Sequence, residues 1–267
     1  MTLKFIGLGL YDEYGISLKG VEEARKSDYI YIELYTSLMP GLSVKNLEAM
    51  VGKPVKALTR TDIEERPEES ILKKAVDKEV ALLVPGDPMN ATTHIDLRLR
   101  AESMGIKTIL IHGASITSAI PGVTGLQSYK FGRTVTIPLS RNHPPLSPYD
   151  HILQNYSRGL HTLILLDMDV EKNKFLLIPQ AVTQLLEMEK SRGKGLMTAD
   201  RLLIGVARVG GPDMEVKAGK LVNLLRHDFG PPPHSIVLPG SLHFMEEEAL
   251  KKIWLRVDQN EEHSGNR

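Results

Sequence analysis

The chain of 267 residues contains no cysteine. Disulfide bonds, cysteine-ligated zinc, iron–sulfur clusters and cysteine nucleophiles are therefore excluded. The chain also lacks excess charge of either sign, because Lys plus Arg and Asp plus Glu both number 33, and this balance favours neither nucleic acid nor membranes as partners. No apolar run is long enough to span a bilayer. The N-terminus does not resemble a signal peptide, so we expect a cytoplasmic protein without direct contacts to nucleic acid or membrane.

Several catalytic motifs are missing as well. There is no Gly-x-Ser-x-Gly nucleophile elbow and no P-loop, which argues against a serine hydrolase and a P-loop nucleotidase. The 9 histidines include no HExxH pair and no other spacing typical of a metal site. We therefore predict no metal, and the sequence identifies no catalytic acid, base or nucleophile.

Apolar runs alternate with helical patterns through the first half of the chain. Strands are predicted at residues 4–10, 28–34, 55–58, 80–84 and 107–111, and helices at 18–27, 42–50 and 92–103, with 62–77 helical in part. Ser17 and Ser43 stand where N-caps are expected. Alternation of this kind predicts an α/β protein with a mostly parallel sheet.

The pattern changes after Gly113, where small and polar residues become frequent. The second half predicts strands at 162–166, 201–207 and 235–238, helices at 179–191, 217–225 and 246–257, and a loop at 141–149. We place two α/β domains at residues 1–113 and 114–257, followed by a polar tail at 258–267.

Two glycine-containing turns end predicted strands. Gly7-Leu8-Gly9-Leu10 follows the first strand, and Gly86-Asp87-Pro88 follows the fourth. The carboxyl edge of an open α/β sheet is where small ligands bind, so the two turns indicate a nucleotide-like cofactor. Asp87 could instead cap the following helix, with Pro88 in its first turn.

A nicotinamide cofactor finds little support. The dinucleotide fingerprint needs a third glycine where this chain has Asp12, although Glu33 could take the place of the acidic ribose ligand. Among the histidines, His94 is expected to be structural, His112 at a strand end is ambiguous, and His234 lies on a loop where sites occur.

Seven segments of the sequence belong to one pattern. They are Phe5-Ile6-Gly7-Leu8-Gly9-Leu10-Tyr11-Asp12-Glu13, Leu34-Tyr35-Thr36-Ser37-Leu38-Met39, Gly86-Asp87-Pro88, Ala91-Thr92-Thr93-His94, Ser115-Ile116, Gly159-Leu160-His161-Thr162-Leu163 and Asp228-Phe229-Gly230-x-Pro232-Pro233-His234. Together they resemble the tetrapyrrole methylase superfamily, and within it the branch that acts in diphthamide biosynthesis. The resemblance covers residues 1 to about 250, and the short chain is similar to the archaeal form.

The resemblance implies a methyltransferase that uses S-adenosylmethionine and releases S-adenosylhomocysteine. The acceptor would be the amino group of a modified histidine in translation elongation factor 2. The implied architecture is a homodimer of two-domain α/β subunits with the cofactor in the cleft between the domains. Matching segments assign the cofactor contacts to Leu10, Asp87, Asn90, Ser115, Ile116, Leu166, Val209 and His234, with Ala207 as a weaker addition.

Position 90 departs from the pattern, since the branch usually has a small apolar residue where this chain has Asn90. Two other functions stay open from the residues. One is a precorrin C-methyltransferase of cobalamin synthesis on the same fold. The other is a non-catalytic binding module for the translation factor, which would not need to bind cofactor.

Overall fold

The computed structural model describes residues 1–139 and 144–254. Its contacts divide the chain into two compact units, Met1–Ile116 and Thr117–Arg267. The predicted polar tail at 258–267, the end of the helix predicted at 246–257 and the start of the loop predicted at 141–149 lie outside the described residues. Each unit contains a five-stranded sheet with helices packed against it.

The sheet of the first unit is entirely parallel, as its strands predict. The strand order is β3-β2-β4-β1-β5. The strands are β1 (Thr2–Gly7), β2 (Tyr29–Glu33), β3 (Val55–Leu58), β4 (Glu79–Val84) and β5 (Lys107–Ile111). Because every strand runs in the same direction, the turns that follow them all meet at one carboxyl edge.

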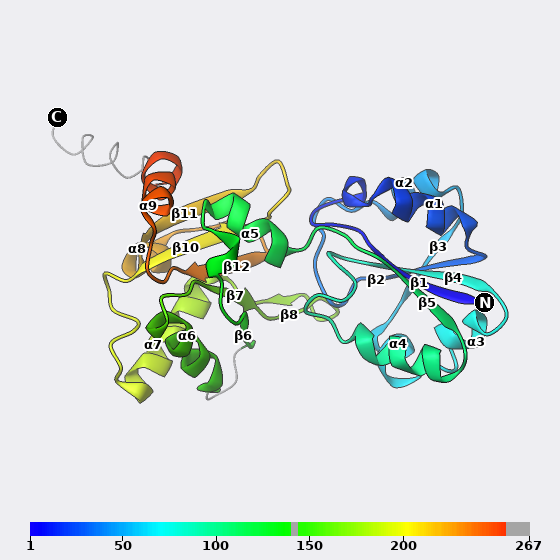
Figure 1. The fold of residues 1–267 in the computed structure, drawn as a ribbon, viewed down its shortest axis with the longest axis horizontal. Helices are drawn as coiled ribbons and strands as arrows, with labels where there is room; N and C mark the ends of the chain where they lie inside the picture. Colours follow the sequence, from blue (N-terminus) through cyan, green and yellow to red (C-terminus); the bar gives the residue numbers. More distant parts are fainter. Residues whose placement is uncertain (140–143, 255–267) are drawn as a thin grey trace. The chain divides into compact units, whose positions relative to one another are not determined.

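Helices cover both faces of this sheet (Figure 1). On one face, α1 (Leu18–Lys26) and α2 (Val44–Val51) pack against Ile6 and Ile32. On the other, α3 (Ile71–Ala75) and α4 (His94–Ser103) pack against Phe5 and Leu82. Neighbouring strand residues point to opposite faces, which explains why β4 is apolar from Val80 to Val84.

Local capping determines where the first helices begin. The Ser17 hydroxyl accepts a hydrogen bond from Gly20 N, and the Ser43 hydroxyl accepts one from Asn46 N. The predicted cap Ser43 is therefore confirmed, and Ser17, after which the first helix was predicted to start, is a cap as well. Short helical turns at Glu13–Gly15 (η1) and Thr61–Glu65 (η2) complete the unit.

The sheet of the second unit is mixed, whereas the parallel arrangement was predicted for the first half of the chain only. The order is β11-β10-β12-β7-β6, and only β6 and β7 pair in parallel. The strands are β6 (Val135–Ile137), β7 (Thr162–Leu166), β10 (Leu202–Ala207), β11 (Glu215–Lys220) and β12 (His234–Leu238). A short turn joins β10 to β11, and such a connection allows only antiparallel pairing.

The core of the second unit lies between this sheet and three helices, α6 (Ser147–Ser157), α7 (Ile178–Arg192) and α8 (Leu221–Arg226). Tyr149, Leu185 and Phe229 are among its buried side chains. The remaining elements are α5 (Ile116–Thr124), η3 (Ser128–Lys130), the hairpin of β8 (Met168–Asp169) and β9 (Lys174–Phe175), α9 (Phe244–Ala249) and η4 (Leu250–Trp254).

Two sequence predictions in this unit are wrong. Residues 217–220 of the predicted helix 217–225 form the edge strand β11, and helix α8 begins only at Leu221. The predicted loop at 141–149 already contains the first turn of α6, which has Pro148 near its start. Strand β6 was not predicted, because three residues give too short an apolar pattern.

Candidate functional site

Three glycines bring the strand ends of the first unit into backbone contact. Leu8 N donates to Val84 O (2.8 Å), and Gly86 N donates to Gly9 O (2.7 Å). A Cβ atom on Gly113, just after β5, would lie 2.4 Å from Gly86 O. Only glycine permits this approach. The two predicted turns therefore lie side by side at the carboxyl edge, and Gly113 is a third member that the sequence analysis missed.

Asp87 holds its own turn rather than a helix. One carboxylate oxygen accepts a hydrogen bond from Met89 N (3.0 Å), and the other lies 2.7 Å from His112 Nδ1. The N-cap of α4 is Thr93. The interpretation of Asp87 as a helix cap, with Pro88 in the first helical turn, is therefore wrong. The ambiguous His112 is therefore a direct partner of this carboxylate, with a side chain that is 72% exposed.

The other predicted residues of this unit follow the ends of the same group of strands. Asn90 is exposed, and its amide donates to the Ser115 hydroxyl (3.3 Å). Leu10 follows the first glycine turn, and Ile116 begins α5; both are partly exposed. One edge thus collects a carboxylate, an amide, a hydroxyl and apolar side chains from the ends of β1, β4 and β5.

The predicted residues of the second unit form a separate group at one edge of its own sheet. His234 begins β12 and pairs with Ala207 at the end of β10, while Leu166 ends the neighbouring strand β7. Val209 follows β10 by two residues. All four residues are buried.

The His234 ring is held neutral by the protein. Its Nε2 lies 3.1 Å from Pro231 O, and Ile178 N donates to its Nδ1 (3.4 Å). A carbonyl can only accept, so Nε2 carries the proton. Burial lowers the pKa of this histidine. Both ring nitrogens therefore have protein partners, and the side chain positions its loop.

Arg208 is a residue of this edge that the sequence analysis missed. It adopts a positive φ of 49° between Ala207 and Val209. Its buried guanidinium donates to Phe229 O (2.6 Å) and Pro231 O (2.5 Å). Arg208 therefore holds the loop before His234 together with the His234 ring. The signal available in the sequence was a charged residue between the apolar Ala207 and Val209.

Glu33 does not take the role of a ribose ligand. Its side chain is fully buried, and its carboxylate accepts hydrogen bonds from Tyr35 N (3.1 Å) and Thr36 N (3.0 Å). Asp12, at the place of the missing third glycine, caps the short turn η1, and α1 begins only at Leu18. No helix N-terminus therefore opens at the first glycine turn, as the nicotinamide hypothesis requires.

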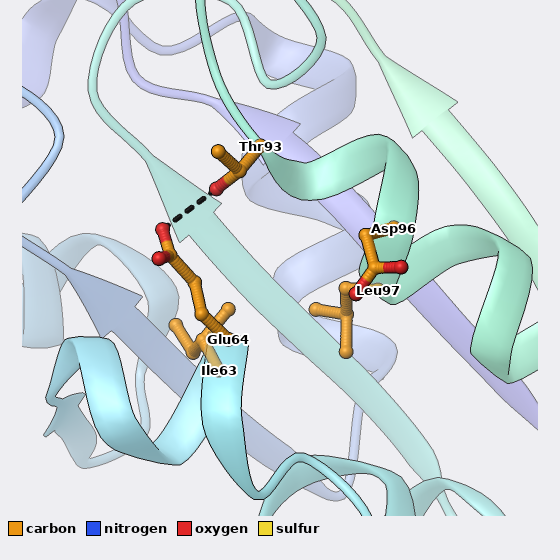
Figure 2. Close-up of a pocket in the computed structure, with 5 residues that line it drawn as sticks. All are labelled: Ile63, Glu64, Thr93, Asp96 and Leu97. Atoms are coloured by element: carbon orange, nitrogen blue, oxygen red, sulfur yellow. Dashed lines mark hydrogen bonds between the residues drawn. The ribbon is translucent and has the colours of Figure 1, made fainter.

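A pocket of about 250 Å³ lies at the same carboxyl edge, between η2 and α4 (Figure 2). Its lining residues are Ile63, Glu64, Thr93, Asp96 and Leu97. Figure 2 shows the Thr93 hydroxyl donating to Glu64 across the pocket, at 2.7 Å. None of the predicted cofactor residues lines this pocket.

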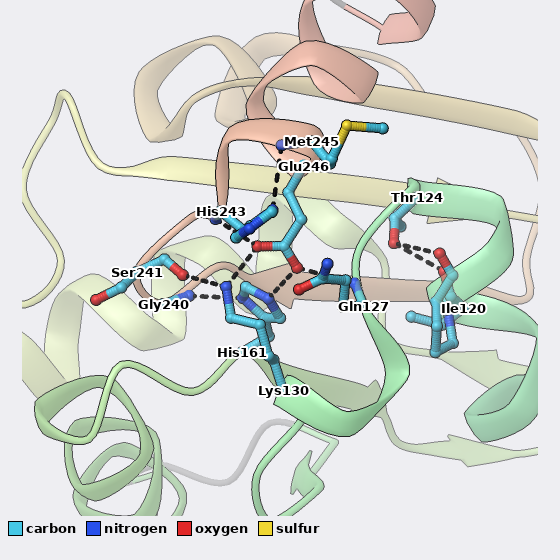
Figure 3. Close-up of polar contacts among 11 residues, drawn as sticks. Ile120, Thr124, Gln127, Lys130, His161, Gly240, Ser241, His243, Met245 and Glu246 are labelled. Atoms are coloured by element: carbon cyan, nitrogen blue, oxygen red, sulfur yellow. Dashed lines mark hydrogen bonds and ion pairs between the residues drawn. The ribbon is translucent and has the colours of Figure 1, made fainter.

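A buried polar network in the second unit is structural (Figure 3). One Glu246 oxygen accepts from Gln127 N (2.8 Å) and His161 Nε2 (2.9 Å). The other accepts from Lys130 Nζ (2.5 Å) and His243 N (2.7 Å). Gly240 N donates to His161 Nδ1 (2.9 Å), so every polar atom of the carboxylate and of the ring has a partner.

Within the described residues, no helix is long and apolar enough to cross a membrane. The same residues contain no group of three His, Asp or Glu side chains placed to hold a metal ion.

Comparison with known proteins gives the family. A family model for tetrapyrrole (corrin/porphyrin) methylases matches residues 2–224. Diphthine synthase of Methanocella arvoryzae is 48% identical over 94% of this chain and 97% of its own. The same enzyme of Methanosarcina mazei is 50% identical over 94% and 95%. A crystal structure of diphthine synthase, 40% identical, superposes with a TM-score of 0.86 over 95% of this chain and 96% of that one. The chain therefore belongs to the tetrapyrrole (corrin/porphyrin) methylase family and, within it, to the diphthine synthases.

Proposed function

We propose that this protein transfers methyl groups from S-adenosylmethionine to the amino group of the modified histidine of translation elongation factor 2, in diphthamide biosynthesis. The observation that carries the proposal is the similarity to diphthine synthases along 94% of the chain. The reaction would take place in the cytoplasm, where the translation factor works.

We propose further that the predicted residues of both units bind the cofactor. The first group supports this because its chemistry fits the ligand. A Cβ atom on Gly86 would find nothing closer than 4.0 Å, whereas one on Gly7 would meet Gly86 O at 2.6 Å. The backbone is therefore tightly packed at Gly7, whereas Gly86 has open space beside it that a ligand could fill. Leu10 and Ile116 supply apolar surface there, and Asp87 supplies a carboxylate for a polar group of the ligand.

The bound cofactor would supply an electrophilic methyl group on its sulfonium, with S-adenosylhomocysteine as the neutral leaving group. The acceptor amine must reach this methyl group unprotonated and aligned. Positioning alone can lower such a barrier by roughly 7–11 kcal/mol. We therefore assign the residues of this edge to binding and orientation, and we assign none of them as a general base.

The deciding experiment is methyl transfer from labelled S-adenosylmethionine to unmethylated elongation factor 2. We expect label on the factor and, in calorimetry, about one S-adenosylhomocysteine site per subunit, with a higher melting temperature in its presence. Label on precorrins but not on the factor would favour the tetrapyrrole enzyme. Binding of the factor with no heat and no thermal shift from either cofactor form would favour the non-catalytic module.

Replacing Asn90 by valine should tighten S-adenosylhomocysteine binding or leave it unchanged. The Asn90 side chain is exposed, and its amide donates to the Ser115 hydroxyl at 3.3 Å. Valine restores the apolar character that the family has at this position. Calorimetry of N90V beside S115A measures the effect. Tenfold weaker binding by N90V would show that the amide contacts the cofactor.

We also propose a homodimer, which the family resemblance implies. Obligate dimer interfaces commonly bury about 2,000 Å² or more, and such an interface should survive dilution to micromolar protein. Light scattering should therefore report twice the subunit mass of 29.7 kDa across that range. A stable monomer that still methylates elongation factor 2 would show that dimerisation does not support the active site.

A further inference from the structure

His94 holds the loop that carries Asp87 and Asn90 from its buried side. The histidine is the first residue of α4 and is fully buried. Its Nδ1 lies 3.2 Å from Pro88 O, in the middle of that loop. A carbonyl can only accept, so the proton of the neutral ring is on Nδ1. The Thr92 hydroxyl donates to the same oxygen at 2.8 Å. Thr92 precedes α4, so His94 is the residue of the helix that contacts this carbonyl.

The opposite ring nitrogen faces a second buried group. His94 Nε2 makes no hydrogen bond and lies 3.9 Å from Glu33 Oε1. Glu33 is also fully buried, at the end of β2. Its carboxylate organises the turn after β2 by accepting from Tyr35 N, Thr36 N and the Thr36 hydroxyl. The two side chains therefore join the loops that follow β2 and β4.

The protonation of this pair decides whether it attracts or repels. With Nδ1 protonated, a neutral His94 presents a bare lone pair to the Glu33 carboxylate, and two acceptors then face each other away from water. A proton on either atom converts the contact into an attractive one. The contact between the two side chains is therefore favourable only when the pair carries a second proton, in addition to the one on His94 Nδ1.

The surroundings favour keeping that proton near neutral pH. Burial raises the pKa of Glu33 to about 7, and the nearby Glu64 carboxylate adds to the effect. Burial lowers the pKa of His94. The Thr36 hydroxyl donates to Glu33. The Tyr35 hydroxyl is buried, and Arg60 lies over the Tyr35 ring and 3.7 Å from Glu64. Below about pH 7 the proton therefore resides mainly on Glu33.

We propose that Glu33 and His94 are positioning residues that share one proton and hold the Asp87–Asn90 loop in its cofactor-binding conformation. This inference rests on the proposed cofactor site at that loop. Neither residue needs to contact the cofactor, because each acts through the backbone of the loop that it holds. Raising the pH removes the shared proton, leaves two acceptors opposed and releases the loop.

Calorimetric titration with S-adenosylhomocysteine between pH 6 and pH 9 tests the proposal. Couplings between linked sites are typically about 5–150-fold, so the wild-type affinity should fall at least about fivefold over this range. The Glu33→Gln variant should lose that pH dependence, since its amide can donate to His94 Nε2 at every pH while its oxygen still accepts from the turn. Any titration of the ligand itself would appear equally in both proteins and so cancels in the comparison.

His94→Asn provides the second variant. It removes the contact to Pro88 O, so binding should weaken at all pH values and the pH dependence should disappear. Thermal unfolding of each variant checks that the first unit is intact. An equal decline in the wild type and in Glu33→Gln, or no decline in the wild type, would overturn the proposal.

A ligand-free measurement separates this inference from the cofactor proposal. Imidazole proton–nitrogen correlations of the wild-type protein should show His94 Nδ1 protonated from pH 6 to pH 9. The Nε2 shift should follow one titration near pH 7, the pKa of Glu33. A constant Nε2 shift would refute the shared proton even if S-adenosylhomocysteine binds. If the cofactor does not bind, only the proposed function fails.

Discussion

Replacing Glu246 by alanine should destabilise the second unit by about 3–5 kcal/mol, the usual cost of removing one partner from a buried charge pair. The carboxylate is fully buried and accepts four hydrogen bonds, from Gln127 N, His161 Nε2, Lys130 Nζ and His243 N. Its removal leaves all four donors without their acceptor. Because 1 kcal/mol shifts the melting temperature of a unit of this size by about 2–4 °C, we expect a loss of about 6–20 °C.

Glu247→Ala is the matched control, one residue further along α9. The Glu247 side chain is 51% exposed and lies 3.8 Å from Lys251. Substitutions of this kind usually change stability by less than about 0.5 kcal/mol. Equal melting temperatures for the two variants would show that the network contributes nothing to the second unit.

The same network predicts acid sensitivity. Burial alone would raise the pKa of Glu246, but the hydrogen bonds from His243 N, Lys130 and Gln127 N outweigh it and lower the pKa to about 2. A lowered carboxyl pKa contributes stability above the ordinary value of 4.5, and this contribution is lost as the pH falls from 4.5 toward about 2. The free energy of unfolding, measured in urea, should therefore fall more steeply across this pH range for the wild type than for Glu246→Ala.

Asp87→Ala should weaken S-adenosylhomocysteine binding by about 10–150-fold, since loss of a hydrogen bond to a charged group typically costs about 1.5–3 kcal/mol. The carboxylate lies at the open edge, where it accepts from Met89 N and pairs with His112. Asp87→Asn can still accept from Met89 N but loses the charge. An intermediate affinity for Asp87→Asn would therefore show that both the hydrogen bond within the turn and the negative charge contribute to cofactor binding.

The control for Asp87 lies at the opposite edge of the same sheet. Asp28 also accepts a backbone hydrogen bond, from Glu79 N at 2.9 Å, but at the start of β2. Asp28→Ala should change stability without changing affinity. If Asp87→Ala lowers the melting temperature and binds the cofactor like the wild type, then Asp87 stabilises its turn and does not contribute to cofactor binding.

Most of the first unit is predictable because its local patterns and its packing agree. The runs at 80–84 and 107–111 appear as β4 (Glu79–Val84) and β5 (Lys107–Ile111). A parallel strand covered by helices on both faces requires a nearly continuous apolar run, and this signal does not depend on distant residues. The caps at Ser17 and Ser43 are equally local, since each hydroxyl accepts from a backbone N–H three residues away.

The second unit shows where local preference fails. Lys217 and Ala218 are good helix formers, and the sequence alone favours a helix there. Pairing with β10 makes them an edge strand instead, from Leu202 opposite Lys220 to Ala207 opposite Glu215. The stabilisation comes from a neighbouring strand, which a local pattern does not contain.

By itself, the sequence determined the family, the two glycine turns and the strand ends that carry Asp87 and Ser115, because these depend on short motifs and on backbone conformations that only glycine adopts readily. Only the tertiary structure decided the partners of these residues. Asp87 pairs with His112 across the sheet edge, and Glu33 lies against His94 rather than at a ligand. Such contacts join residues from separate strands, and their geometry is set by how the whole sheet and its helices pack.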